Sequence, residues 1–375
     1  MNQKDPIDWN EVRSRFPLTS NYRYFNTASS GAIAQRTATA MNRFYEDQLH
    51  HAAVHSKAWM ESKAEAKSYA AALIGASSEH IAFTTDVSVS MNFVADKIDP
   101  KTEIVLLRGD FPSVNLPWMT RGFSVTWISK NADNSVSKAA IEEAIGDGNK
   151  ALAISWVQYS SGFTLDMQWL SALCRNKNTL LLVDATQAVG AIPVDMQKTP
   201  VDMLVASCFK WQGGGYGISI YYENPDVGFV REAKSIGWNT LKQFGKDYEQ
   251  ANRHQQARAI EGGHAKYANV AALEHGLREM HEIGLHQIYQ RVQELRKYLI
   301  GGLKGIKVSF HSPVDLPNQS AIVCIKASQA LYDHLNQQDI KCTKREDYIR
   351  LSVHYYNNEG DIDFLIDQIS AFQSQ

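Results

Sequence analysis

Short runs of apolar and β-branched residues alternate with helix-forming stretches through the first half of the chain. The apolar runs cover residues 104–107, 124–128, 151–157, 179–183 and 203–207, and helical patterns occupy residues 138–145 and 167–177. Apolar strands that alternate with helices are typical of a mostly parallel sheet covered on both faces. The pattern predicts an α/β fold, in which ligands bind beyond the carboxyl ends of the strands.

Helices flank this region on both sides. Alanine-rich patterns predict helices over residues 32–50 and 57–74, and Gly75 is placed to end the second of them. After about residue 255 the pattern changes to long helices and short strands. It predicts helices over residues 265–282, 285–300 and 361–372, the last capped by Asn357 or Asn358, and strands over residues 307–310, 321–325 and 349–353. We therefore expect a large domain over residues 18–256 and a small α+β domain over residues 257–375, joined by the N-terminal segment 1–17.

Composition and charge exclude several classes of protein. At ~150 residues per domain, a chain of 375 residues has room for two or three domains. Lysine and arginine number 38 against 40 aspartates and glutamates, so the net charge is −2 and a nucleic-acid-binding or membrane-surface protein is not expected. The four scattered cysteines form no CxxC pair, and the N-terminus lacks the apolar segment of a signal peptide. We expect a cytoplasmic protein that neither spans nor binds a membrane.

Two charged residues follow predicted strands and could form one reactive site. Asp184 ends the run TLLLVD, and Lys210 lies three residues beyond the run MLVAS, just ahead of Gly213, Gly214 and Gly215. Taken alone, Asp184 fits a helix N-cap and Lys210 fits a solvated loop. The three glycines, however, let the backbone turn sharply or approach a ligand, and a lysine there could form a Schiff base.

Two more strand ends complete a set. Ser88 lies at the start of a predicted helix, where backbone N–H groups favour phosphate, although simple capping would also explain it. Phe111 follows the strand at residues 104–107, where an aromatic ring could stack on a planar ligand or simply join the core. A phosphate cradle, an aromatic lid, an acid and a lysine are together what pyridoxal 5′-phosphate (PLP) requires: the lysine carries the cofactor as an imine, and the acid keeps its ring nitrogen protonated.

With these residues the sequence resembles the class V aminotransferase family of PLP enzymes of fold type I, which includes cysteine desulfurases, selenocysteine lyases and isopenicillin N epimerase. The resemblance runs from YFNTASSGAI (residues 24–33) to RLSVHYYN (residues 350–357), and its most specific blocks are VDATQAVGAIPVD (residues 183–195) and ASCFKWQGGGYG (residues 206–217). It implies a large domain with a mainly parallel sheet and a smaller C-terminal domain.

The resemblance also implies roles for individual residues around the cofactor. Lys210 is the lysine that binds PLP and moves the proton, Asp184 pairs with the ring nitrogen, and Gln187 bonds the ring 3-hydroxyl. The remaining implied cofactor residues are Ser88 and Ser207 at the phosphate with the backbone near Val87, Phe111 over the ring, Tyr159 near the ring oxygen, and Gly263 and His264 in EGGHAKY. The family counterpart of EGGHAKY reaches the phosphate of a neighbouring subunit, so we expect a homodimer with shared active sites.

For the substrate, a small amino acid, the resemblance points to Ala28 and to Arg350, whose planar fork suits a carboxylate. Two features depart from the desulfurase pattern. Phe209 replaces the histidine that precedes the lysine, and Cys342 lies only eight residues before Arg350, in a segment too compact for a mobile nucleophile loop. The layout is more similar to the epimerase-type branch, in which Lys344 or Arg345 would add a second basic contact.

Three functions remain open from the sequence. The first, which we favour, is PLP-dependent chemistry at Cα of an amino acid, aminotransferase- or epimerase-like. The second is a cysteine desulfurase or selenocysteine lyase, which the missing loop weakens without removing, since some lyases need no cysteine. The third is a cofactor-free scaffold protein, against which the joint presence of Lys210, Asp184 and Gln187 argues.

Overall fold

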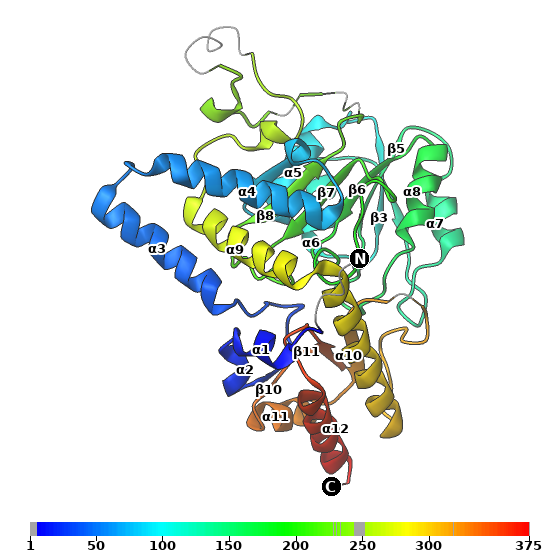
Figure 1. Cartoon of the computed structure of the whole chain (residues 1–375). Helices are drawn as coiled ribbons and strands as arrows, with labels where there is room; N and C mark the ends of the chain where they lie inside the picture. Colours follow the sequence, from blue (N-terminus) through cyan, green and yellow to red (C-terminus); the bar gives the residue numbers. More distant parts are fainter. Residues whose placement is uncertain are drawn as a thin grey trace.

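A seven-stranded sheet forms the centre of the molecule in the computed structural model, which describes residues 6–227, 229, 231–232, 234–243, 252–317 and 319–374 (Figure 1). The strand order is β2-β8-β7-β6-β5-β3-β4, and β8 alone of these runs antiparallel to its neighbours. The strands are β2 (Ile81–Thr84), β3 (Glu103–Leu107), β4 (Val125–Ile128), β5 (Lys150–Ser155), β6 (Leu180–Asp184), β7 (Met203–Ser207) and β8 (Ser219–Glu223). The predicted α/β fold with a mainly parallel sheet is confirmed.

Both faces of this sheet are covered, because successive side chains of a strand point to opposite sides. On β3, Val105 and Leu107 join one apolar cluster while Ile104 and Leu106 join another. The first cluster includes side chains of α4 (Ser56–Ile74), α7 (Lys138–Ile145), α8 (Met167–Asn176) and α9 (Tyr267–Ile283), and the second includes those of α5 (Val87–Lys97) and α6 (Pro112–Met119). Burial on both faces explains why these strands are continuously apolar in the sequence.

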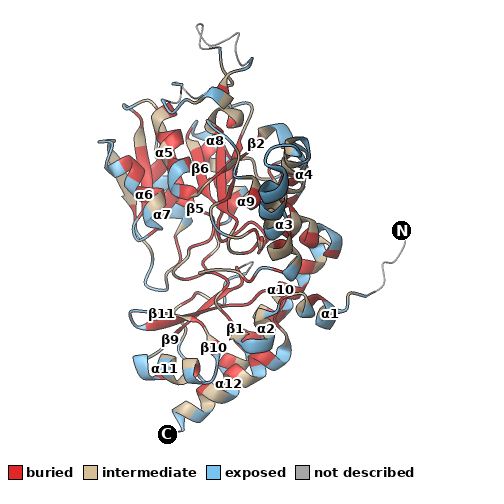
Figure 2. Cartoon of the chain, turned by 90° about the vertical axis from the view of Figure 1, so that its left-hand side faces the viewer, coloured by how far each residue is buried: buried red, intermediate tan, exposed pale blue. Residues whose placement is uncertain are grey.

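Two smaller sheets lie beneath the large one (Figure 2). One is antiparallel, with the order β11-β12-β9, and the other pairs β1 in parallel with β10. Their strands are β1 (Arg23–Tyr24), β9 (Ile322–Lys326), β10 (Ile340–Lys341), β11 (Thr343–Arg345) and β12 (Tyr348–Ser352). The remaining helices are α1 (Trp9–Ser14), α2 (Leu18–Asn21), α3 (Gln35–His51), α10 (Leu285–Gly305), α11 (Gln329–Gln337) and α12 (Glu359–Gln373), with short 3₁₀ turns η1 (Ser78–His80), η2 (Trp238–Thr240) and η3 (Ala257–Ile260).

The N-terminal segment contacts the C-terminal helix. Arg13 of α1 makes an ion pair of 2.7 Å with Asp361 of α12, and β1 pairs with β10. α9 packs instead against α3 and α4, beside the large sheet. The domain boundary at residues 256 and 257 stays a prediction.

Most predicted elements appear, and one predicted strand does not. Gly75 ends α4 in the left-handed conformation, and Asn358 caps α12. The strand predicted over residues 307–310 is wrong: Lys307 has a φ of 58°, and of this segment only Phe310 forms an isolated bridge, with Ile325. Among the described residues, no helix is both long and apolar enough to cross a bilayer.

Candidate active site

One cavity collects most of the residues that the sequence singles out. It lies beyond the carboxyl ends of β5, β6 and β7 and at the N-terminus of α5. The sequence-predicted residues that line it are Val87, Ser88, Phe111, Tyr159, Asp184, Gln187, Ser207 and Lys210. Their convergence follows from the topology, because parallel strands bring their carboxyl ends to one edge of the sheet.

Burial shifts the pKa values of two charged residues of this cavity, Lys210 and Asp184, in opposite directions. Burial lowers the pKa of Lys210 to about 8, with Arg350 and Arg345 also lowering it and Asp184 opposing them. Burial raises the pKa of Asp184 to about 6, although the backbone N–H of Thr186 donates to its Oδ1 at 2.9 Å and Lys210 lies nearby. Within the described part of the chain, no hydrogen-bond acceptor is found for Lys210 Nζ, which lies 5.3 Å from the centre of the Phe209 ring. The amine is therefore free to react.

Glycines make the backbone around Lys210 unusually close-packed. A Cβ on Gly31 would lie 1.8 Å from the carbonyl oxygen of Lys210, and the Gly31 N–H donates to Phe209 at 2.9 Å. Beyond the lysine, Gly213 and Gly215 have φ values of 60° and 73°, which disfavour other residues. Gly31 therefore lets the segment before α3 lie against the lysine, and the positive φ values explain the glycines at positions 213 and 215.

The N-terminus of α5 presents backbone N–H groups and hydroxyls to the cavity. Asp86, rather than Ser88, is the N-cap, and its carboxylate accepts from the Val89 N–H at 2.9 Å. Ser88 Oγ is consequently not used for capping and lies 2.7 Å from Ser113 Oγ. Together with Ser207 this set of donors suits a phosphate.

Gln187 is fixed by two contacts that the sequence did not reveal. Its Nε2 donates to the carbonyl oxygen of Ala28 at 2.8 Å, and its Oε1 accepts from Trp211 Nε1 at 2.9 Å. One N–H of the amide remains for a ligand, which is compatible with a ring hydroxyl. Ala28 itself is buried, and its N–H donates to Ser352 of β12.

Arg350 on β12 is a buried cation that forms no ion pair among the described residues. Its side chain is buried, with the residue 2% exposed, yet it donates only to the carbonyl oxygen of Tyr159 at 2.8 Å and to Ser29 Oγ at 2.6 Å. Its Nε has no partner among the described residues, and burial lowers its pKa. A buried guanidinium without a carboxylate partner is costly unless an anion binds to it.

The register of the β11–β12 hairpin shows whether Lys344 or Arg345 lies on the same face as Arg350, where a second basic contact to the substrate is predicted. Thr343 pairs with Arg350 and Arg345 pairs with Tyr348, so Arg345 lies on the face of Arg350 and Lys344 lies on the opposite face. Arg345 lies 6.0 Å from the ring centre of Tyr159, which also contacts Phe111 edge-on. Lys344 is held by the carbonyl oxygens of Arg345 and Glu346. Arg345 is therefore the candidate for a second basic contact.

Sequence analysis missed Asp110, a buried carboxylate beside the cavity. It lies three residues beyond the end of β3 and accepts from the backbone N–H and the hydroxyl of Ser155, at 2.9 and 2.6 Å, and from Gln158. The signal was its place one residue before Phe111, at a strand end. Thr186, also missed, receives the N–H of Ser207 on its hydroxyl at 3.1 Å.

Gly263 and His264 are not brought to Lys210. They line a separate cavity, together with Lys63, Thr85 and Val89. His264 lies 4.9 Å from Trp238, ring to ring. Their predicted role at the phosphate of a second subunit stays a prediction.

The cysteines are all buried. Burial raises the pKa of each thiol, to about 12 for Cys342, Cys208, Cys324 and Cys174 alike. Cys342 lies between β10 and β11 at 5% exposure, so neither its protonation state nor its position suits a nucleophile.

The donor set of the cavity fits PLP. The amine of Lys210 has no hydrogen-bond acceptor among the described residues and can bind an aldehyde. Asp184 supplies a buried carboxylate, and the N-terminus of α5 supplies hydrogen-bond donors for a phosphate. Pyridoxal phosphate needs these three kinds of group.

Comparisons with known proteins agree with this fit. The family described as Aminotransferase class-V matches residues 23–365. An uncharacterized aminotransferase, YcbU, of Bacillus subtilis is 25% identical over 366 residues, 96% of this chain and 97% of that protein. A probable cysteine desulfurase of Pyrococcus abyssi is also 25% identical, over 84% of this chain and 80% of that protein.

Solved structures share the fold. A cysteine desulfurase from Thermococcus onnurineus superimposes with a TM-score of 0.88 at 22% identity, covering 99% of both chains. The cystine C–S lyase C-DES, solved with its product cysteine persulfide, gives a TM-score of 0.86 at 20% identity, covering 95% of this chain and 99% of that one.

Proposed function

Because the chain belongs to the class V aminotransferase family of PLP-dependent enzymes, we propose that it acts at Cα of an amino acid in an aminotransferase- or epimerase-like reaction. In this proposal Lys210 binds the cofactor and moves the α-proton, and Arg350 holds the α-carboxylate. Asp184, Gln187, Ser88 and Ser207 orient the cofactor.

The observation that carries the proposal is the buried, unpaired guanidinium of Arg350. With only Tyr159 and Ser29 as acceptors, it keeps three N–H donors unused. It is also close enough to Lys210 to depress the pKa of the lysine. A carboxylate placed on Arg350 would neutralise it, and the α-carbon next to that carboxylate would lie toward the lysine.

The residues support proton transfer at that carbon. PLP, when bound, supplies an electron sink that stabilises negative charge at Cα. Lys210, with its pKa lowered to about 8, has a substantial neutral fraction near pH 7–8 and can accept a proton there. Asp184 is buried beside it and ionised above about pH 6, so it can hold a positive charge on the ring nitrogen.

The four buried cysteines argue against a desulfurase that transfers sulfur to its own thiol. Such a nucleophile must be exposed and ionised, whereas the pKa of Cys342 is raised to about 12. A C–S or C–Se lyase that uses no cysteine remains the alternative, supported by the similarity in fold to the cystine C–S lyase C-DES. A scaffold without cofactor would not need a reactive lysine and an unpaired arginine in one place.

A homodimer is part of the proposal. Gly263 and His264 lie outside the Lys210 cavity, where they could serve a second copy. Large apolar side chains also stand exposed on α3, α4, α5 and α6: Leu49, Met60, Val89, Leu116 and Met119. Of these residue types, methionine is enriched at interfaces. Sedimentation of the holoenzyme would test this, and an active monomer would refute it.

The experiment that tests the reaction is a panel of amino acids with product detection. The holoenzyme is incubated with each amino acid, with and without a keto acid, and analysed for keto acid, alanine, sulfide and inverted enantiomer. Keto acid formed without release of sulfide, or the inverted enantiomer, supports our proposal. Release of sulfide from cysteine, with alanine or pyruvate as the carbon product, would favour the lyase alternative.

A further inference from the structure

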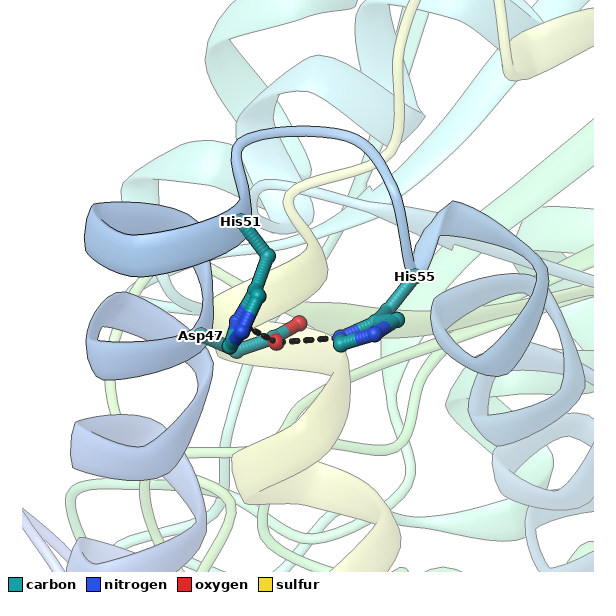
Figure 3. A group of neighbouring side chains, drawn as sticks. All are labelled: Asp47, His51 and His55. Carbon is teal, nitrogen blue, oxygen red and sulfur yellow. Dashed lines mark hydrogen bonds and ion pairs between the residues drawn. The ribbon is translucent and has the colours of Figure 1, made fainter.

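Three side chains converge on one point at the turn between α3 and α4, far from the active site. Asp47 and His51 come from the last turns of α3, and His55 precedes α4 (Figure 3). One ligand atom from each lies within 4.8 Å of the others. The turn projects from the body of the molecule at the left of Figure 1.

The helix and the turn set this arrangement. Residues 47 and 51 are four apart and share one face of α3. α3 then ends, and Ala52 takes a φ of 50°, which reverses the chain and brings His55 back over the same face. His51 Nδ1 and His55 Nδ1 lie 3.1 and 2.6 Å from the same oxygen, Asp47 Oδ1, and the rings are 4.6 Å apart.

A hydrogen bond from α4 holds the second carboxylate oxygen of Asp47, Oδ2, in place. Trp59 Nε1 of α4 donates to Asp47 Oδ2 at 3.0 Å, and the indole packs against Phe44 and Tyr267. Oδ1 is thereby aimed at the two imidazoles. Hydrogen-bonded partners that orient a ligand in this way are typical of metal sites.

We propose that Asp47, His51 and His55 bind a divalent transition-metal ion, with Zn²⁺ the best match, and that water completes the coordination. Two imidazole nitrogens and one carboxylate oxygen are ligands that Zn²⁺ accepts at ~2.0–2.2 Å. A tetrahedral ion holds its ligand atoms roughly 3.4 Å apart on those bond lengths. The two separations between an imidazole nitrogen and Asp47 Oδ1, 3.1 and 2.6 Å, are already below that value, and all three ligand atoms lie within 4.8 Å of one another, so side-chain rotations can bring them around one ion. The imidazoles stand about half exposed, which gives the ion a path in.

The bound ion would cross-link the end of α3 to the start of α4. The turn between them, residues 52–55, is exposed throughout. Hydrogen bonds and ion pairs between exposed groups contribute little to stability by themselves, whereas a metal ion fixes several side chains at once. We therefore expect the ion to rigidify the hairpin without taking part in chemistry at Lys210.

Metal binding to the chelator-treated holoenzyme tests the proposal. Titration with Zn²⁺ by calorimetry should show one site per chain, and Co²⁺ should give the visible bands of a tetrahedral complex above the PLP absorption. Asp47→Ala, His51→Ala and His55→Ala should each weaken Zn²⁺ binding by roughly 100-fold or more, whereas Trp59→Phe, which keeps an aromatic ring, should weaken it by about 10-fold.

His50→Ala is the matched control, because His50 is exposed next to His51 but outside the cluster. It should bind Zn²⁺ like the wild type. Circular dichroism and thermal unfolding in chelator establish that each variant is folded, and a misfolded His55→Ala would be replaced by His55→Gln. Zn²⁺ should also slow hydrogen exchange at residues 47–59 in the wild type. Absence of binding, or equal binding by wild type and the three ligand variants, would overturn the proposal.

Discussion

Arg350 Nη1 donates to the carbonyl oxygen of Tyr159 at 2.8 Å, across 191 positions of the sequence. This bond ties β12, in the small antiparallel sheet, to the segment that follows β5 in the large sheet. Both residues face the neighbourhood of Lys210, whose pKa Arg350 depresses. The proposed carboxylate site therefore exists only when the two sheets are assembled.

Replacing Arg350 should weaken the use of amino-acid substrates without lowering the stability of the fold. Losing one partner of a buried charge pair costs about 2–5 kcal/mol, so Arg350→Met should lower kcat/KM by roughly 30- to 4000-fold. The loss should be confined to substrates with an α-carboxylate, since decarboxylated amines make no such contact. In the cofactor-free protein, Arg350→Met should leave the Tm unchanged or raise it, because it removes an unpaired buried cation. An equal loss for amines and amino acids would contradict the assignment.

Cofactor uptake should report the pKa of Lys210. Burial lowers this pKa to about 8. Below pH 8 the amine is mostly protonated and cannot attack an aldehyde, so the rate of PLP incorporation should rise about tenfold per unit from pH 6 to 7.5. Above about pH 8.5 it should level off. Stopped-flow absorbance on cofactor-free protein measures this, and a rate that keeps rising to pH 10, as for an ordinary lysine, would contradict the shift.

Arg345 and its neighbour Lys344 provide a test variant and a matched control for the second basic contact. Arg345 shares the face of Arg350, and Lys344 lies on the opposite face. We expect Arg345→Ala to lower kcat/KM for amino acids with an anionic side chain by about tenfold or more, relative to their uncharged amides, and Lys344→Ala to change this ratio less than twofold. Similar effects of the two variants would remove Arg345 from the site.

Cys342 should be dispensable. With its pKa raised to about 12 by burial, the thiol is un-ionised throughout the range in which the enzyme works. Cys342→Ala should keep full activity, and iodoacetamide should label the native protein at this position only after unfolding, as mass spectrometry would show. If wild type releases sulfide from cysteine briskly in reductant and Cys342→Ala loses that activity while retaining PLP, the desulfurase function replaces ours.

The apolar pattern predicts the parallel strands well, because a strand buried on both faces appears in the sequence as a continuous run of apolar residues. Residues 203–207 were predicted as a strand and form β7 with the same bounds. β8 escaped prediction because its ends, Ser219 and Glu223, are polar yet buried. Ser219 bonds Ser207, and Glu223 pairs with Lys97, so its burial depends on partners distant in the sequence.

In the active site, too, some residues can be predicted from the local sequence, whereas the roles of others depend on contacts with distant residues. Lys210 and Asp184 follow strands and could be found from local pattern. The local pattern also places Asp110 near a strand end, but its hydrogen bonds with Ser155 and Gln158 form only in the folded chain. The choice between Lys344 and Arg345 likewise depends on the hairpin register, which the sequence leaves undetermined.

Exchange of the α-proton in D₂O tests the central claim most directly. The holoenzyme is mixed with a panel of amino acids, and the loss of the Cα–H signal is followed by NMR. Our account predicts exchange at Cα for at least one amino acid in the wild type and a loss of more than about 1000-fold in Lys210→Ala supplied with PLP, with Lys344→Ala unaffected. Undiminished exchange in Lys210→Ala, or no exchange with any amino acid in a wild type that carries PLP, would contradict it.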